Sequence, residues 1–209
     1  MPPGDDGTWT LTVGPLALGI YNYTFEVGGV SAPDPRNRLR SASPPHSIVE
    51  VKGETLSLSD PDAFEHAEVH MHWHDSPDCG CQSLAVYVPL GYEEGKAEHP
   101  VFCLLNGVGE RRIDWISDGR LNVIADNLAA LQQAEPMIIV MPQKNPLDSG
   151  NPGEDFQAFD RYFSREVIPF AEHRYRIRSG RESRAIAGKS MGVYLRSTFG
   201  WIGLGSSVA

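Results

Sequence analysis

The sequence is short of cysteine, of basic charge and of long apolar runs, and each shortage excludes a class of protein. Three cysteines in 209 residues (Cys79, Cys81 and Cys103) are too few for a disulfide framework. Lysine and arginine number 18 against 27 acidic residues, a net charge of −9 without a basic patch, which argues against a nucleic-acid partner. No run is apolar enough to span a membrane, so no membrane partner is expected.

The chain also lacks the marks of a targeting sequence. Its first six residues have no basic start and no apolar core, so the sequence predicts no signal peptide within this chain. No cofactor is predicted, and the oligomeric state is left open. The composition, 41% hydrophobic and 22% charged, is that of a globular protein, and the length suits one moderate domain or two small ones.

Helix candidates are absent before residue 100, and the first part of the chain has the pattern of β-structure. Short alternating segments at 9–13, 21–27 and 47–51, separated by glycine- and proline-containing turns, predict a small β-sandwich over residues 1–54. The middle segment would place four apolar or aromatic side chains on one face, for which core packing is expected: Tyr21, Tyr23, Phe25 and Val27.

A polar stretch over residues 55–66 reads as a linker to a second domain, residues 67–209. This domain begins with segments at 67–74 and 84–88, which predict an antiparallel hairpin. From residue 100 the pattern changes to continuous apolar runs, typical of strands buried on both faces: 101–105, 137–141 and the segment from Ala185.

Helical spacing of apolar residues connects these buried strands. One helix is predicted around 121–131, with Asp118 as its N-cap, and a longer one over 156–170, which Pro169 should bend or end. Strand, helix, strand, helix, strand is a βαβ series, so the sequence predicts a mostly parallel sheet with flanking helices. Cys103 falls inside a buried run and is expected to be an inert thiol.

The last apolar strand runs into Gly188-Lys189-Ser190-Met191-Gly192, which matches the G-x-S-x-G nucleophile elbow of α/β-hydrolases. Glycines flank the serine because the strand-to-helix turn is too tight for side chains there. Ser190 is therefore the candidate nucleophile, and the backbone N–H of Met191 is the first candidate oxyanion donor.

The second half of the chain resembles the esterase D and enterochelin-esterase-like branch of the α/β-hydrolases, which includes feruloyl and acetylxylan esterases. The matching segments occur in the family's order: 100–110, 119–128, 136–142, 166–170 and 184–192. The first half is similar to the immunoglobulin-like domain that precedes many such esterases and is related to starch- and glycogen-type carbohydrate-binding modules, by residues 19–27 and 34–37.

This resemblance implies an enzyme that releases feruloyl or acetyl groups from plant polysaccharide, secreted or periplasmic, with an esterified polysaccharide or oligosaccharide as substrate. It also implies that the N–H of Val108 is the second oxyanion donor. The family has histidine where this chain has Asn106, so an altered loop geometry is expected.

The general base is missing from its usual place. In α/β-hydrolases the acid and the histidine follow the serine, yet all seven histidines precede Ser190 and none of the 19 residues after it is Asp, Glu or His. A serine without a base is a poor nucleophile. The sequence therefore predicts a C-terminally truncated copy, with a hydrolase sheet incomplete at one edge and an uncertain activity.

Two other interpretations stay open. His70, His72 and His74 share one face of a strand near Cys79 and Cys81, and these residue types suit Zn²⁺. Side chains two apart along a strand fan out, however, so a solvent-facing histidine stripe is preferred and no metal is predicted. The second interpretation is a non-catalytic carbohydrate-binding module, in which Trp9, Tyr21 and Tyr23 stack on sugar rings.

Overall fold

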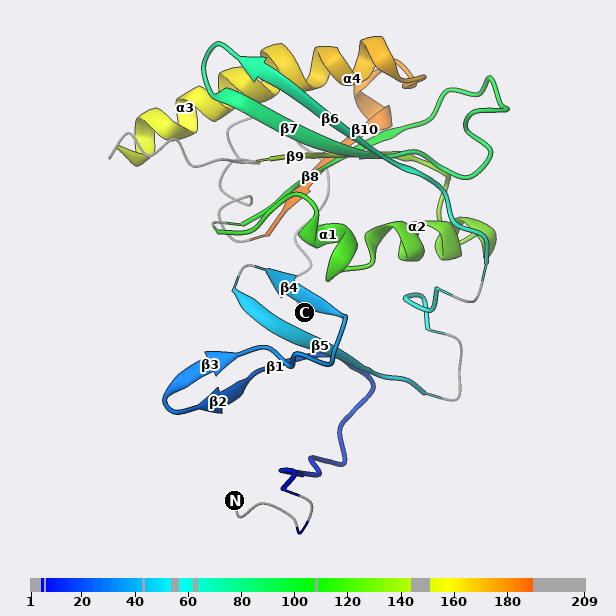
Figure 1. The fold of residues 1–209 in the computed structure, drawn as a ribbon. Coiled ribbons are helices and arrows are strands. Elements are labelled where there is room, and N and C mark those ends of the chain that lie inside the picture. Colours follow the sequence, from blue (N-terminus) through cyan, green and yellow to red (C-terminus); the bar gives the residue numbers. More distant parts are fainter. Residues whose placement is uncertain are drawn as a thin grey trace.

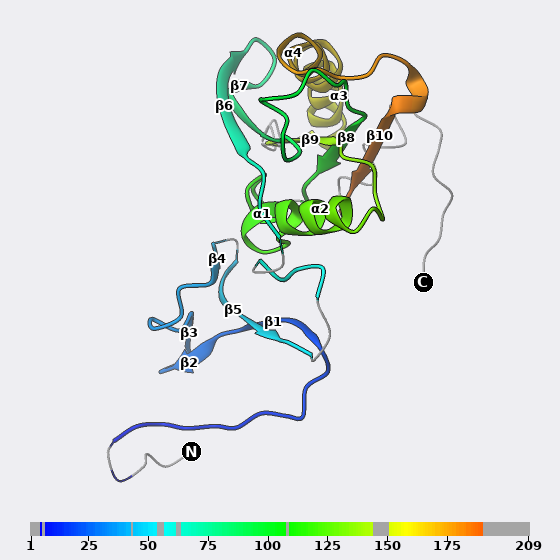
Figure 2. The same ribbon diagram turned by 90° about the vertical axis from the view of Figure 1, so that its right-hand side faces the viewer.

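The structure is a computed structural model and describes residues 5, 7–42, 44–53, 57–61, 64–107, 109–143 and 151–189. In these ranges two groups of strands stand apart, a small N-terminal group and a larger sheet between helices, with α1 and α2 facing the N-terminal group (Figures 1 and 2). No helix of the described ranges is long and apolar enough to cross a membrane.

The large sheet has five strands in the order β10-β8-β9-β7-β6. Their bounds are β6 (Val69–Ser76), β7 (Gly80–Tyr87), β8 (Val101–Leu105), β9 (Ile138–Pro142) and β10 (Arg184–Gly188). Strand β8 pairs in parallel with both β9 and β10, whereas β7 pairs antiparallel with β6 and β9. The predicted hairpin and the three predicted parallel strands are thus confirmed, in a mixed sheet.

Helices cover both faces of this sheet, which is why its central strands are apolar throughout. On one face lie α1 (Asp114–Ser117) and α2 (Leu121–Ala130), and on the other lie α3 (Pro152–Tyr162), a π-helical turn (Phe163–Val167) and α4 (Ile168–Arg174) (Figure 1). Alternate residues of β7 separate into the two cores: Leu84 and Val86 pack toward the α3 side, Ala85 and Tyr87 toward the α2 side. Cys103 is fully buried, as predicted, and burial raises the pKa of its thiol to about 12.

Pro169 neither ends the long helix nor lies at its last turn. The helix passes through the π-helical turn immediately before it and continues to Arg174. Because proline lacks an N–H and its ring collides with the carbonyl four residues back, a widened turn at this place accommodates it. His173 lies exposed in the last turn.

The predicted N-cap of the second helix is wrong. Asp118 ends α1, and its N–H donates to the carbonyl of Asp114. The residue that precedes α2 is Arg120, in the left-handed conformation with φ of 49°. A short helix and a left-handed residue therefore occupy the stretch before α2, where the sequence pattern predicts only an N-cap.

The N-terminal strands differ most from prediction. They are β1 (Gly19–Tyr23), β2 (Phe25–Val27), β3 (Val30–Ala32), β4 (Arg40–Ala42) and β5 (Pro45–Val51), which form a β1-β5-β4 sheet and a separate β2-β3 pair. Residues 9–13 form no strand, and the predicted strand 21–27 is broken at Thr24.

The expected burial of one face of that strand is also wrong. Phe25 is 50% and Val27 71% exposed, because β2 leaves the sheet to pair with β3 around the predicted Gly28-Gly29 turn. Tyr21 and Tyr23 are half-buried, and the hydroxyl of Tyr23 donates to Asp34 over 2.9 Å. Strands at the expected spacing are present, whereas their closure into an immunoglobulin-like sandwich stays a prediction.

The segment predicted as a linker is tied to α2. Asn127, fully buried, donates from its side-chain amide to the carbonyls of Leu58 and Asp60 at 2.8 and 3.0 Å. Asp126 accepts hydrogen bonds from the N–H of Ala67 at 3.1 Å and the hydroxyl of Tyr87 at 2.7 Å. The two polar residues of this α2 turn thus fix the chain between the N-terminal strands and β6.

Candidate functional site

The candidate site begins where two parallel strands end side by side. Gly188, the last residue of β10, is in register with Leu105, the last residue of β8. The N–H of Lys189 then donates to the carbonyl of Leu105 over 3.1 Å. Because parallel strands present their carboxyl ends at one edge of a sheet, the chain leaving β10 and the glycine loop after β8 start at the same place.

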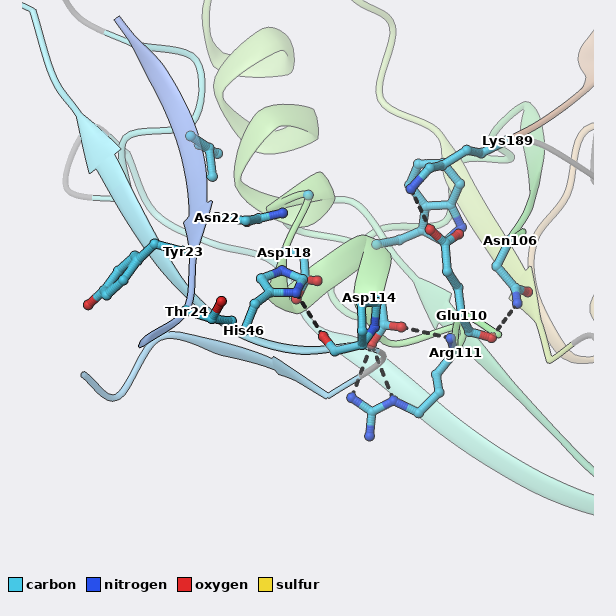
Figure 3. A pocket seen from close by; sticks show the side chains of 14 residues that line it. Asn22, Tyr23, Thr24, His46, Asn106, Glu110, Arg111, Asp114, Asp118 and Lys189 are labelled. Atoms are coloured by element: carbon cyan, nitrogen blue, oxygen red, sulfur yellow. Dashed lines mark hydrogen bonds and ion pairs between the residues drawn. The ribbon is translucent and has the colours of Figure 1, made fainter. Parts of the chain in front are cut away.

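Glu110 holds the glycine loop and the end of β10 together (Figure 3). One carboxylate oxygen accepts from the N–H of Gly107 at 2.9 Å, and the other forms an ion pair with the ammonium of Lys189. The Glu110 carbonyl accepts from the side-chain amide of Asn106 at 2.7 Å. Gly109 has φ of +77°, a conformation that suits glycine and lets the loop turn back on itself.

The electrostatics of Glu110 agree with this role. Partial burial acts to raise the pKa of its carboxyl, but the hydrogen bonds from Lys189 and from the Gly107 N–H outweigh it and hold the pKa below its usual value. Glu110 is therefore a charged anchor at neutral pH, and its two oxygens have different partners.

A pocket of about 700 Å³ opens beside this anchor. Its walls come from two parts of the chain that are far apart in the sequence. Figure 3 shows Asn22, Thr24 and His46 of the N-terminal strands on one side and Glu110, Arg111 and Asp114 of the loop and α1 on the other. Gly119 closes the α1 side, where an added Cβ would lie only 2.8 Å from the carbonyl oxygen of Trp115.

Three polar atoms of the pocket lining are shielded from water and have no hydrogen-bond partner in the described part of the chain. They are Asn106 Oδ1, His46 Nε2 and Trp115 Nε1. A buried polar atom without a partner costs about 1–3 kcal/mol. These three atoms therefore need partners that the described residues do not supply.

Of the site residues predicted from the sequence, the structure describes some and leaves others outside its described ranges. Asn106 lies at the end of β8, only 1% exposed, and its amide locks the loop. The candidate nucleophile Ser190 and the candidate oxyanion donors Met191 and Val108 lie outside the described residues. Their roles therefore stay predictions, and the structure places only their immediate neighbours.

The histidine stripe does not face solvent, so that interpretation is wrong. His70 and His72 lie at 3.1 and 2.6 Å from the hydroxyl of Tyr175, and His74 stacks on Tyr162 with ring centroids 5.6 Å apart. Burial, together with nearby cations, lowers the pKa of His72. In the described residues no three His, Cys, Asp or Glu side chains are placed to hold a metal ion.

Sequence reasoning missed the residues that shape the pocket. Glu110 and Lys189 are 79 positions apart, so no local pattern links them. No sequence motif marks His46, which lies in β5 among the N-terminal strands. The only available signal was the position of Glu110 at the end of a glycine loop and of Lys189 inside the elbow motif.

Comparison of the sequence with known proteins identifies the family to which it is similar. Residues 80–195 match the family described as "Putative esterase". An endo-1,4-beta-xylanase/feruloyl esterase from Xylanibacter ruminicola is 30% identical over 199 residues, which is 90% of this chain and 27% of that protein. Endo-1,4-beta-xylanase Y from Acetivibrio thermocellus is 35% identical over 124 residues, 54% of this chain and 11% of that protein. The chain thus spans about a quarter or less of these relatives.

Solved structures agree. A CE1 ferulic acid esterase from Anaeromyces mucronatus, in complex with ferulic acid, has a TM-score of 0.56 at 26% identity over 65% of this chain and 53% of that one. The feruloyl esterase module from Clostridium thermocellum, complexed with sinapinate, has a TM-score of 0.54 at 26% identity over 69% of this chain and 52% of that one. An enterobactin esterase from Shigella flexneri, 17% identical with a TM-score of 0.58 over 78% of this chain and 41% of that one, shares the fold.

Proposed function

Because the chain belongs to the putative esterase family, we propose that it acts in the hydrolysis of carboxylic esters, namely feruloyl or acetyl esters of plant polysaccharide. Its relatives include an endo-1,4-beta-xylanase/feruloyl esterase and a ferulic acid esterase, which supports this substrate class. The observation that carries the proposal is the meeting of the β8 glycine loop and the end of β10 at one pocket, joined through Glu110 and Lys189.

In this proposal Ser190 attacks the ester carbonyl. The N–H groups of Met191 and Val108 stabilise the negative charge that develops on the carbonyl oxygen, a contribution worth about 10²–10³ in rate for one donor. Glu110 and Lys189 keep the loop that carries Val108 beside the strand that leads to Ser190. Asn106, which bonds the Glu110 carbonyl, shapes the same loop.

The serine needs a base to become a good nucleophile. No His, Asp or Glu follows Ser190 within the 209 residues, which is where α/β-hydrolases carry these groups. We therefore expect the 209-residue chain to hydrolyse esters slowly by itself. Added imidazole, which can accept the serine proton from solution, should raise its rate.

Turnover of methyl ferulate, measured with and without imidazole, tests this proposal. The chain is expected to show a saturable increase with imidazole, and Ser190→Ala should abolish the increase. Equal imidazole-dependent rates in the two proteins would remove Ser190 from the mechanism. A high rate of turnover without imidazole would contradict the expectation that this chain lacks a general base. If His46→Ala then abolished that rate, the base would lie in the N-terminal strands.

The division of the chain belongs to the same proposal. We treat residues 1–54 as an immunoglobulin-like domain, 55–66 as a connecting segment and 67–209 as the esterase domain. By resemblance the protein acts outside the cytoplasm, on polymer. The alternative, a non-catalytic carbohydrate-binding module, would predict binding of xylan by residues 1–66 without any esterase activity of the whole chain.

A further inference from the structure

One arginine close to the glycine loop lacks an acidic partner in the described part of the chain. Arg112 lies two positions after Glu110, and its side chain makes a single hydrogen bond there, a long one of 3.5 Å from Nη1 to Gln143 Oε1. Its Nε is shielded from water and has no partner among the described residues. Five other arginines are each paired with Asp or Glu: Arg111, Arg120, Arg161, Arg178 and Arg184. Arg112 is therefore a half-buried cation whose counter-charge the described residues do not supply.

The surroundings of Arg112 oppose its charge. Burial, and then the neighbouring cation of Arg111, lower the pKa of the Arg112 guanidinium. The guanidinium nevertheless stays protonated at neutral pH, because arginine does not lose its proton in proteins. The whole chain carries a net charge of −9 and repels anions at a distance, so an anion that stays at Arg112 must be held by contacts made there.

A row of contacts across the sheet places this cation beside an exposed tryptophan. Trp73 on β6 is in register with Ser83 on β7, and the Ser83 carbonyl accepts from the N–H of Gln143 at 2.8 Å. The side-chain oxygen of Gln143 in turn accepts from the N–H of Arg112 at 3.0 Å. The guanidinium carbon of Arg112 lies 5.6 Å from the centre of the Trp73 ring, within the range of a cation–π contact. Contacts of the backbone thus hold Arg112 and Trp73 next to each other.

Together the two side chains offer two kinds of contact at one place. Trp73 is 65% exposed, which is ordinary for a single surface tryptophan, but here its ring lies beside a guanidinium without a counter-charge. An arginine that stacks on an aromatic face keeps N–H groups free to donate in its own plane, where they match the two oxygens of a carboxylate. The rest of the indole face is open to another flat ring. A ligand with a carboxylate on a ring therefore satisfies both residues.

We propose that Arg112 and Trp73 form a binding site for a carboxylate carried by a ring compound. This chemistry is shared by a free hydroxycinnamic acid, such as ferulic acid, and by a uronic acid unit of a polysaccharide. The site lies away from the strand end that leads to Ser190, because β6 and β10 are the opposite edges of the described sheet, roughly 19 Å apart at about 4.8 Å per strand. The inference goes beyond the proposed function, since binding of a carboxylate here requires no ester hydrolysis.

Two pairs of ligands, in which only one member carries a free carboxylate, test the inference: ferulate with methyl ferulate, and xylotriose bearing one glucuronic acid unit with xylotriose. Each is titrated into the 209-residue chain carrying Ser190→Ala, so that no ester is hydrolysed, and the indole N–H signals are followed by NMR. The Trp73 signal should shift saturably with at least one acid, which should bind about tenfold or more tighter than its neutral partner. The pair that shows this difference identifies the source of the carboxylate. Trp9, equally exposed at 65%, should not shift with that acid.

Substitutions then assign the contacts. Arg112→Gln removes the charge but keeps the backbone N–H that bonds Gln143, and it should weaken binding of the acid about tenfold or more. Arg112→Lys keeps the charge but loses the planar fork, so an intermediate affinity is expected. Trp73→Ala removes the stacking face and should also weaken binding of the acid. The matched control Arg178→Gln removes an arginine that is already paired with Glu135, and it should leave binding unchanged.

The inference is overturned if neither acid shifts the Trp73 signal saturably, or if acid and neutral partner bind equally in both pairs. Unaltered binding of the acid by a folded Arg112→Gln chain also overturns it, as does an equal shift of Trp9, which would show binding to any exposed indole. The ligand comparison needs no substitution at Arg112, so it decides even where Arg112→Gln does not fold. Turnover plays no part in these measurements, so failure of the proposed function would leave their result standing.

Discussion

At the scale of single residues, the site depends on one carboxylate with two partners. Glu110 accepts from the N–H of Gly107 and pairs with Lys189, so it joins a loop to a strand end that is 79 positions away. A glycine loop has few side chains with which to fix its own shape. The orientation of its backbone N–H groups therefore depends on this anchor, which gives a direct prediction for catalysis.

Replacing Glu110 should lower imidazole-dependent turnover of methyl ferulate. Glu110→Ala removes both contacts and is expected to lower kcat about 10²-fold, comparable to the loss of one oxyanion donor. Glu110→Gln keeps an acceptor for Gly107 but loses the ion pair, so an intermediate rate is expected. Glu135→Ala, which breaks an exposed pair with Arg178, is the control and should leave turnover unchanged. Wild-type kcat in Glu110→Ala would refute the anchoring role.

His72 makes the stability of the chain depend on pH. Burial, with nearby cations, lowers its pKa in the folded state below the value of about 6.5 expected when unfolded. Between these two values the unfolded chain binds a proton that the folded chain does not, so stability is fully present above pH of about 6.5 and falls as the pH drops through the folded pKa.

Urea unfolding at pH 7.5 and 5.5 measures this effect. The unchanged chain should lose stability toward the lower pH, and His72→Gln should lose less, because glutamine does not titrate but can still bond the Tyr175 hydroxyl. His173→Gln, at an exposed position, should behave as the unchanged chain. An identical loss in His72→Gln would show that other groups carry the pH dependence.

At the scale of elements, α2 fastens the segment that enters the large sheet. Asp126, 4% exposed, accepts hydrogen bonds from Ala67 N–H and Tyr87 Oη–H and lies 3.1 Å from His66 Nδ1. Burial and the neighbouring Asp126 both raise the pKa of Tyr87, so its hydroxyl stays a donor. Several elements therefore depend on one acidic side chain.

Removing Asp126 should destabilise the chain more than removing its partner's hydroxyl. Asp126→Ala leaves buried donors unpaired and should lower the free energy of unfolding by about 3 kcal/mol, whereas Tyr87→Phe should cost about 1 kcal/mol. Chemical denaturation gives both values. Asp75→Ala, on the exposed side of the edge strand β6, is the control. Equal costs for the two buried variants would mean that Asp126 serves Tyr87 alone.

The same elements show what the sequence could and could not predict. Strands β8 and β9 were predicted closely because a strand buried on both faces is apolar at nearly every position. Strand β10 was predicted from its apolar residues after Arg184, although it lies at the edge of the described sheet. The alternation at 21–27 led to a wrong prediction of burial for Phe25 and Val27. Alternating apolar residues form a buried face only where a second layer of structure covers that face. Asp126 and Asn127 lie in the segment 119–128 that resembles the family. Their hydrogen bonds join residues 59 and 69 positions away, which no local pattern reveals.

At the scale of the whole molecule, Arg120 connects the N-terminal strands to the esterase fold. Its guanidinium lies 2.6 Å from Glu50 Oε2 and 3.0 Å from the Ser59 carbonyl. Its backbone is left-handed, a conformation that costs a side-chain-bearing residue about 1–2 kcal/mol. The contact is thus maintained in spite of backbone strain.

Two substitutions separate the contact from the strain. Arg120→Gly loses the contact but relieves the strain, and Arg120→Ala loses the contact and keeps the strain. The free energy of unfolding of Arg120→Ala, measured in urea, should therefore be about 1 kcal/mol lower than that of Arg120→Gly. Both should be cleaved faster by protease within residues 51–61 than the unchanged chain. Unaltered cleavage in both would show that Arg120 does not hold the two regions together.

We propose that Ser190, two positions after the end of β10 in the sequence, is the nucleophile of this chain. Labelling with a fluorophosphonate in the presence of imidazole, followed by peptide mass mapping, tests it most directly. A single adduct on Ser190, absent after unfolding in urea, is the predicted result. An adduct on another residue, or equal labelling of Ser190 in the folded and unfolded chain, would contradict it.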